Sequence, residues 1–414
     1  MTERHWTVTR LAWRDRILDT IDLPRRPLVL REGFGSGLTT RAGDPPGTLW
    51  AICDRGPNLK VKVARKLYGA EGLESLAEVE GAKIMPRTDI GPSFAELRVR
   101  GDRVDIVRTV RMQARAEVPL QGVPIPPGES AACEAAYDLD GRLIEADPAG
   151  ADTEGIAALS DGSFWVGEEY APSLLRVAPD GQVVERLVPA GSEERLGGAP
   201  FPVRGALPHL AAKRRLNRGF EALAVSGDGL RLHLMFQSPL SHPDDRAHAQ
   251  ARHIRLWTLD AATGAPLTQH LYPLDPHESF LRDRAKGPFE GSDVKVGEIA
   301  ACGPDGLLVL ERGSETSRIY RVSLRSAPAL PPEHWELETR PTVEQLSAAG
   351  DLHLPVLSKR LLFDSDDAPE VAADLEGMAL LSPTEIVLVS DNDFGVEGAE
   401  TSFWCIAFAS PVDG

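Results

Sequence analysis

A short phrase that recurs along the chain constrains its fold more than any other feature. Each full copy begins with a glutamate, continues with small or apolar residues, and is followed by a turn and a second apolar run. Full copies occupy residues 154–157, 221–224, 298–301 and 376–379, and a weaker first copy occupies 36–39. A repeat of this length predicts an array of similar units.

The turns within the repeats indicate that each unit is a small antiparallel sheet. Asp-Gly pairs separate apolar runs and favour hairpins, because both residues tolerate positive φ. These pairs occupy 161–162, 180–181, 228–229 and 305–306. Four antiparallel strands in one unit are the pattern of a propeller blade.

The last unit shows only three apolar runs before the chain ends. Residues 5–13 alternate imperfectly between apolar and polar and could supply its fourth strand, which would close the ring and remove open sheet edges. We therefore predict an all-β protein: a single β-propeller domain over residues 1–414, with five four-stranded blades and long inter-strand loops. A sixth, irregular blade in residues 113–150 is the alternative. Residues 67–78 and 343–349 are expected to form short helices.

The composition restricts the possible partners of the chain. Its 414 residues carry a formal net charge of −17, which disfavours nucleic acid and anionic membranes because both would be repelled. No run approaches the roughly 20 apolar residues of a membrane helix. Residues 1–16 contain no apolar signal core, so we expect a cytoplasmic location, or a periplasmic or secreted one if a leader has been removed. The four cysteines are far apart and are expected to be free thiols.

The repeated glutamates are the strongest candidates for a functional site. In a propeller the innermost strands line a central channel, and each glutamate opens such a strand. The neighbouring strands run the other way and finish in acidic residues, so both sets should meet at one mouth of the channel. Carboxylates that close would repel one another or recruit a cation, and an oxygen-rich cluster without Cys or His suits Ca²⁺. The predicted calcium ligands are Glu154, Glu221, Glu298, Glu376, Asp54, Glu169, Glu311 and Asp391.

A structural interpretation of the same acids stays open. Each glutamate could accept backbone N–H bonds, or could pair with an arginine between blades, because Arg55, Arg218 and Arg312 stand beside the acids. Arg55 could instead bind a phosphate or a carboxylate in bidentate fashion. The chain has no GxSxG elbow, no P-loop and no GxGxxG fingerprint.

Several segments, taken in order, resemble the phytase-like family described as having esterase-like activity of phytase. They read GSGL (35–38), DRGPN (54–58), DTEGIA (152–157), WVGEEY (165–170), FEALA (220–224), QSPL (237–240), LVLER (308–312) and DNDF (391–394). The resemblance runs from about residue 33 to 408 and implies a β-propeller. The family's name implies hydrolysis of phosphate or carboxylic esters. The copy at 298 departs from the pattern, since Ile299 stands where the other copies have Gly or Ala.

The leading hypothesis is a Ca²⁺-dependent hydrolase of phosphate or related esters, acting on a small anionic ester. Glu154 and Glu221 are its candidate catalytic carboxylates, and Arg55 and Arg312 would neutralise charge on the substrate. One alternative is a lactonase- or gluconolactonase-like propeller hydrolase. The other is a non-catalytic propeller that binds a small ligand or a protein, in which calcium would only hold the blades together.

Overall fold

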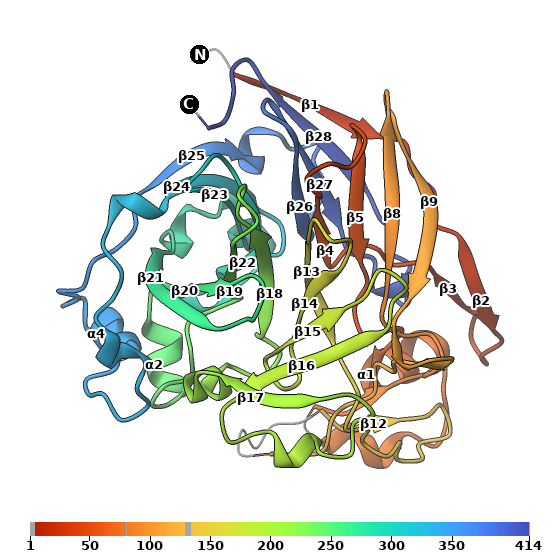
Figure 1. The fold of residues 1–414 in the computed structure, drawn as a ribbon. Coiled ribbons are helices and arrows are strands. Elements are labelled where there is room, and N and C mark those ends of the chain that lie inside the picture. The colour runs from red at the N-terminus through yellow and green to blue at the C-terminus, as the bar shows by residue number, and fades with distance from the viewer. Residues whose placement is uncertain (1–4, 80, 129–133, 414) are drawn as a thin grey trace.

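Five larger sheets, each of four or five strands, make up most of the molecule (Figure 1). The structure is a computed structural model that describes residues 5–79, 81–128 and 134–413. Neighbouring strands in these sheets are antiparallel, except that β17 joins β16 in parallel. The prediction of an all-β protein is confirmed.

The five sheets follow one another along the chain. The first contains β4 (Gly37–Thr39), β5 (Thr48–Ile52), β8 (Ser93–Arg100) and β9 (Arg103–Arg111). The second contains β13 (Thr153–Ala158), β14 (Phe164–Glu168), β15 (Ser173–Val177), β16 (Val183–Pro189) and β17 (Val203–Leu207). The third contains β18 (Phe220–Val225), β19 (Arg231–Phe236), β20 (His253–Asp260) and β21 (Pro266–Pro273). The fourth contains β22 (Lys295–Ala301), β23 (Gly306–Arg312), β24 (Ser317–Ser323) and β25 (Lys359–Asp364). The fifth contains β26 (Leu375–Ser382), β27 (Glu385–Ser390), β28 (Phe403–Phe408) and β1 (Trp6–Leu11).

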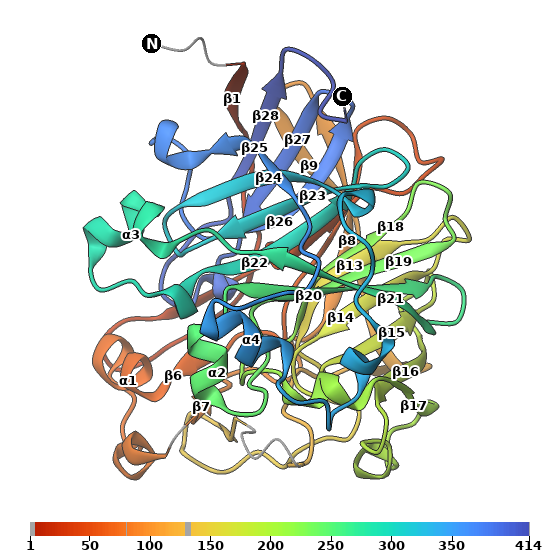
Figure 2. The ribbon, with the colours of Figure 1, turned by 90° about the vertical axis from the view of Figure 1, so that its left-hand side faces the viewer.

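Smaller elements occupy the long connections. The short strands are β2 (Ile17–Ile21), β3 (Leu28–Arg31), β6 (Leu59–Lys60), β7 (Lys83–Ile84), β10 (Gln113–Arg115), β11 (Val118–Pro119) and β12 (Ala136–Tyr137). The helices are α1 (Val61–Val63), α2 (Asp245–Gln250), α3 (Leu281–Lys286) and α4 (Val343–Ala349). Figures 1 and 2 place α1 with β6, β7 and β12 below the larger sheets.

The predicted helices have different outcomes. α4 coincides with the expected helix at 343–349, and Thr342 caps its first turn by accepting the N–H of Gln345. The expected helix over 67–78 is instead a π-helical turn at Ala64–Tyr68 and a 3₁₀ turn at Glu74–Glu78.

Across the described part of the chain, no helix combines the length and apolar character that a membrane crossing requires.

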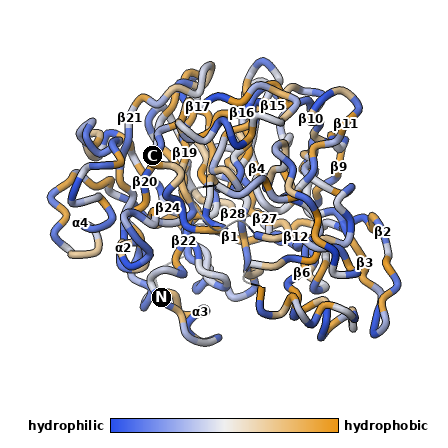
Figure 3. Tube along the Cα trace, turned by 90° about the horizontal axis from the view of Figure 1, so that it is seen from below, coloured by the Kyte–Doolittle hydropathy of each residue, from blue (hydrophilic) through white to orange (hydrophobic). Residues whose placement is uncertain are grey.

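The first strand of each larger sheet lies innermost. β4, β13, β18, β22 and β26 contact one another in chain order, and β26 also contacts β4. The apolar core lies between adjacent sheets; Trp50 and Phe94 of the first sheet, for example, pack on Phe164 of the second, with ring centroids 5.0 and 4.6 Å away. Burying side chains of this size contributes roughly 1.5–3 kcal/mol each. Apolar and polar stretches accordingly intermix throughout the tube in Figure 3. The arrangement is that of a β-propeller.

The two ends of the chain share the fifth sheet. β1 pairs with β28 in antiparallel register, from Trp6 opposite Phe408 to Leu11 opposite Phe403. Trp6 also packs edge-on against Phe363 of β25, with ring centroids 4.8 Å apart. The N-terminal segment therefore supplies the fourth strand that the last unit lacked.

Residues 113–150 do not form a sixth blade within their described parts, 113–128 and 134–150. They contain the two-stranded β10–β11 pair and β12, which joins β7 in parallel. The segment carries Pro119, Pro124, Pro126 and Pro127. Proline has no N–H to donate to a sheet ladder, which explains why this stretch adds no four-stranded sheet.

The fourth copy of the repeated phrase is offset by one residue from the others. Four of the inner strands, β13, β18, β22 and β26, carry a bulge near their start, and the bulged residue is Glu221 in β18 and Glu376 in β26. In β22 the bulged residue is Gly297, so that Glu298 pairs directly with Leu310. Because side chains alternate along a strand, a shift of one residue reverses the direction in which a glutamate points.

Glu298 consequently lies among the inner strands and not at their start. Its side-chain oxygens accept the backbone N–H groups of Leu38 at 3.1 Å, Leu223 at 3.3 Å and Ile299 at 3.0 Å. Glu298 is fully buried. A Cβ atom added to Gly37 would come within 3.3 Å of its Oε2, so the small residue of β4 leaves the space that this carboxylate fills. Burial raises the pKa of Glu298 well above its ordinary value, against the opposing effect of the three N–H donors.

Replacing this carboxylate should destabilise the fold. In Glu298→Gln one acceptor oxygen becomes an NH₂ group that faces a backbone N–H, and we expect a loss of about 2–4 kcal/mol in the free energy of unfolding, measured in urea. Glu278→Gln is the matched control, since that side chain is 64% exposed, and should change stability by less than about 0.5 kcal/mol. Equal stability of the two variants would contradict the conclusion that Glu298 stabilises the fold by accepting N–H groups from three inner strands.

Candidate functional site

A charged cavity opens where the inner strands begin. Its volume is about 190 Å³. Its lining residues are Asp54, Arg55, Asn58, Lys83, Glu154, Glu169, Asn217, Arg218, Glu221, Gln237, Lys295, Glu376, Asp391 and Asp393. Seven of these residues are acidic and four are basic, and none is aliphatic or aromatic. The cavity is therefore suited to ions and polar groups.

Six of the eight predicted calcium ligands line this cavity: Asp54, Glu154, Glu169, Glu221, Glu376 and Asp391. The expected convergence is wrong for Glu298 and Glu311. Glu298 is directed among the inner strands by the offset of β22. Glu311 is buried and accepts hydrogen bonds from the Tyr272 hydroxyl at 2.6 Å, the Asp275 N–H at 2.8 Å and Lys359 Nζ at 2.6 Å.

The pairing registers explain where the second-strand acids point. Glu311 pairs with Val296, just as Glu168 pairs with Thr153. Both carboxylates are buried and accept hydrogen bonds, Glu168 from the Tyr170 N–H and Glu311 from the Tyr272 hydroxyl. The cavity is reached by the following residue, which is Glu169 in the second sheet. In the fourth sheet the following residue is Arg312, so a cation takes that position.

Carboxylates crowd two sides of the cavity. Oxygens of Asp54, Asp391 and Asp393 lie within 4.8 Å of one another, and so do oxygens of Asp152, Glu154 and Glu169. Burial, opposed by the Gly56 N–H and Arg55 and reinforced by Asp393, raises the pKa of Asp54 to about 7. Burial and neighbouring carboxylates likewise raise the pKa values of Glu154 and Asp391 well above their ordinary range.

Glu221 bridges toward the second of these groups. It is 5% exposed, and its Oε1 has no hydrogen-bond partner among the described residues. Burial raises the pKa of Glu221, and contact with the Glu169 carboxyl raises it further. Two carboxyl groups in contact need either a shared proton or a cation between them.

Both predicted catalytic arginines are already engaged by carboxylates. Arg55, at 5% exposure, forms ion pairs with Glu134 and Asp152 and donates to Asn217 Oδ1 at 3.0 Å. Its guanidinium also lies over the Tyr170 ring, 5.1 Å from the centroid.

Arg312 is fully buried and pairs with Glu376 and with Asp374, the latter at 2.8 Å. Arg55 and Arg312 thus hold the acidic side chains in place, as the ion-pair alternative expects.

Two cations of the cavity are not held in this way. Among the described residues, no ion pair within 4.0 Å involves Arg218 or Lys295, and Arg218 Nη1 is buried without a hydrogen-bond partner. The sequence analysis considered Arg218 only as an ion-pair partner and missed Lys295. The position of Lys295 depends on strand register, since it precedes the bulge of its inner strand by two residues, as Asp374 precedes the bulge of β26.

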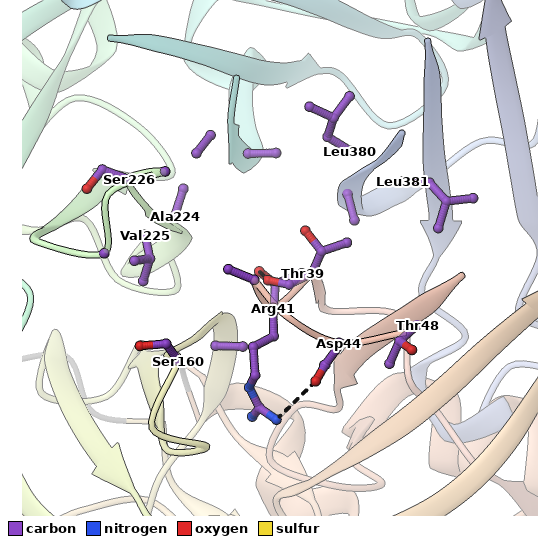
Figure 4. Close-up of a pocket in the computed structure, with 18 of the residues that line it drawn as sticks. Thr39, Arg41, Asp44, Thr48, Ser160, Ala224, Val225, Ser226, Leu380 and Leu381 are labelled. Carbon is purple, nitrogen blue, oxygen red and sulfur yellow. Dashed lines mark hydrogen bonds and ion pairs between the residues drawn. The ribbon is translucent and has the colours of Figure 1, made fainter. Parts of the chain in front are cut away.

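A second cavity, of about 360 Å³, lies at the other end of the inner strands (Figure 4). Alanines and hydroxyl residues dominate its wall, and its Arg41 and Asp44 pair at 3.9 Å. Arg41 is itself packed between Trp50 and Phe164, 4.4 and 4.7 Å from their ring centroids. The dense charge of the molecule's axis is thus confined to the first cavity.

The fold and site together define a β-propeller with a carboxylate-rich cavity at one mouth. Residues 32–394 match the family model described as phytase-like, esterase-like activity of phytase, and the chain belongs to that family. A curated relative, an uncharacterized secreted protein of Arthroderma benhamiae, is 26% identical over 331 residues, which are 69% of this chain and 60% of the relative. The chain thus spans 60% of the length of this relative.

Three solved structures show weaker likeness. A luciferin-regenerating enzyme has a TM-score of 0.37 at 10% identity, with 97% of this chain and 95% of that chain covered. The PQQ-bound aldose sugar dehydrogenase of Streptomyces coelicolor has a TM-score of 0.36 at 12% identity, with 95% of this chain and 98% of that chain covered. The calcium-binding protein regucalcin of Agrobacterium tumefaciens has a TM-score of 0.35 at 13% identity, with 98% of this chain and 97% of that chain covered. Likeness at this level does not carry over an activity or a ligand.

Removing Arg55 should unfold the protein more readily, because it leaves buried carboxylates without a counter-charge. We expect Arg55→Met to lower the free energy of unfolding by about 3–5 kcal/mol. Arg142→Met is the control, since this arginine pairs only with surface aspartates and its side chain is 73% exposed. Its effect should stay below about 1 kcal/mol. Urea unfolding of both variants measures the difference, and similar losses would contradict a structural role for Arg55.

Proposed function

We propose that this chain is a five-bladed propeller whose charged cavity binds Ca²⁺ and hydrolyses phosphate or related esters. The five larger sheets and the β1–β28 pairing support the blade count and a ring closed by the N-terminal strand. Membership of the phytase-like family supports ester hydrolysis as the class of reaction.

The crowding of carboxylates is the observation that carries the proposal. Seven acids share a cavity of about 190 Å³. Burial and neighbouring carboxylates raise the pKa values of Asp54, Glu154 and Glu221, which supports a site that a cation would complete. Among the described residues the lining includes no His or Cys, and carboxylate oxygens are the ligands of a hard cation. The residues therefore fit calcium better than zinc.

The candidate ligands fall on two sides. Asp54, Asp391 and Asp393 form one group, and Glu154, Glu169 and Glu221 reach the other, where Asp152 is already paired with Arg55. Bound calcium would hold substrate oxygens and lower the pKa of a coordinated water. Glu376 is held by Arg312 and serves to shape the wall.

Glu154 and Glu221 are the proposed proton-transfer groups. Burial and neighbouring carboxylates raise their pKa values, and a carboxylate whose pKa is raised is a stronger base toward water. Arg55 and Arg312 act as positioning residues through the carboxylates they bind. The cavity volume admits a small anionic group and excludes a macromolecule from this site.

The location of the protein stays a prediction, and the relative's description as secreted favours the exported alternative.

Calcium binding and turnover test the proposal directly. Calorimetry should show calcium binding, and hydrolysis of p-nitrophenyl phosphate or p-nitrophenyl acetate should cease with chelator. Glu221→Gln should weaken calcium binding at least about tenfold, because it removes a charged ligand. Glu311→Gln is the matched control: it should alter stability and leave calcium affinity unchanged.

The outcomes also separate the alternatives. Turnover that is indifferent to chelation contradicts the metal mechanism. Calcium that raises the melting temperature without turnover of any ester or lactone supports the non-catalytic propeller, and selective lactone hydrolysis supports the lactonase.

Calcium affinity should depend on pH in a defined direction. Because the pKa of Asp54 is raised to about 7, this group is largely protonated below pH 7 and must lose its proton before it can bind a cation. Affinity should therefore rise from pH 6 to pH 8, with protons released on binding. Calorimetry in buffers of different ionisation enthalpy measures the release, and Asp54→Asn should reduce it. Affinity that is constant over this range would contradict the assignment of Asp54.

A further inference from the structure

The charged cavity is polarised: its two cations without an ion-pair partner among the described residues come from sheets that contribute only one of its acids. The two carboxylate clusters belong to the first, second and fifth sheets and their loops, and Glu221 of β18 is the one lining acid from the third sheet. Lys295 begins β22, and Arg218 lies two residues before β18. The sector between the third and fourth sheets thus contributes Arg218 and Lys295 to the cavity beside one carboxylate, that of Glu221.

The offset of β22 creates this sector. Gly297 occupies the bulge position that a glutamate fills in the second, third and fifth sheets, so the fourth sheet contributes no acid at this level. Lys295 stands two residues before that bulge, where the fifth sheet has Asp374. Arg312 stands at the end of β23, where the second sheet has Glu169. At each of these three positions the fourth sheet carries a more positive residue than the sheets with which it is compared.

Arg218 and Lys295 differ from the other basic residues of the cavity in having no fixed partner. Arg55 is held by Glu134 and Asp152, and Lys83 lies 3.6 Å from Glu134. For Arg218, by contrast, burial lowers the pKa and the Nη1 atom stays without an acceptor among the described residues. A buried donor without an acceptor is costly, and an anion placed against it would remove that cost.

We propose that Arg218 and Lys295 form an anion-binding subsite that takes the phosphate or carboxylate group of the substrate. The inference rests on the proposed function for the identity of that substrate, but the subsite itself is defined by its two cations. A tetrahedral oxyanion offers oxygens to a guanidinium and an ammonium at once, in charge-assisted hydrogen bonds. Gln237, also in the lining, adds an uncharged amide on the same side. The subsite would orient the ester so that its reacting bond faces the carboxylates.

Inorganic phosphate is the probe for this subsite. The full chain is titrated with phosphate by calorimetry, both with chelator and with sub-millimolar calcium. We expect Lys295→Met and Arg218→Met each to weaken phosphate binding at least about tenfold, the effect of losing one charge-assisted contact. Lys295→Arg should stay within about threefold of the unmodified protein, because it keeps the charge.

Lys286→Met is the matched control for the loss of one positive charge, since Lys286 is 72% exposed and remote from the cavity lining. It should bind phosphate as the unmodified protein does. Circular dichroism and calcium titration of every variant establish that the fold and the acidic groups are intact. Phosphate binding that survives in both methionine variants would overturn the subsite, as would an absence of binding by the unmodified protein under both conditions.

The same experiment separates this inference from the proposed function. If calcium binding and ester hydrolysis occur while phosphate binding ignores both cations, the hydrolase stands and the subsite falls. If phosphate binds through Arg218 and Lys295 while no ester is turned over, the subsite stands and the hydrolase falls.

Discussion

The carboxylate of Glu298 is the contact around which the centre of this molecule is organised. It accepts N–H groups from β4, β18 and its own β22, three inner strands that are far apart in the sequence. Gly37 of β4 leaves room for it, since an added Cβ would come within 3.3 Å of its Oε2. Glu298 lines neither the charged cavity at one end of the inner strands nor the alanine-lined cavity at the other end.

The same residue shows how a one-residue offset in one strand changes a whole site. Had β22 followed the other inner strands, a fourth glutamate would face the cavity and Lys295 would not occupy its present position. The offset exchanges an acid for glycine at the mouth, so that the third and fourth sheets contribute two cations without an ion-pair partner in the described part of the chain and only one acid, Glu221, to the cavity. A cavity surrounded by acids alone would bind cations and repel an anionic substrate; one with a positive sector can hold both.

The sequence predicted the elements of this fold better than their contacts. Apolar periodicity and Asp-Gly turns located most strands, and the shortage of one strand in the last unit led to the N-terminal segment that pairs with β28. The strand register could not be predicted. The copies of the phrase align on their glutamates in the sequence, but the position of the bulge in the strand decides the direction in which each side chain points. Ile299 was the visible signal of the offset. Partners such as Glu134 for Arg55 lie 79 residues away in the chain, and no local pattern encodes them.

The carboxylates of the cavity carry a cost that the rest of the fold must offset. Burial and mutual repulsion raise the pKa values of several of them, so at neutral pH each ionised group opposes folding. Arg312 lowers that cost at Glu376, but among the described residues no ion pair within 4.0 Å involves Glu154 or Glu221. A protein that only needed stability would replace such groups by apolar side chains. Their presence in a cavity lined by polar groups supports the proposal that a cation binds there, and a cation that binds only the folded state would raise the stability of the fold.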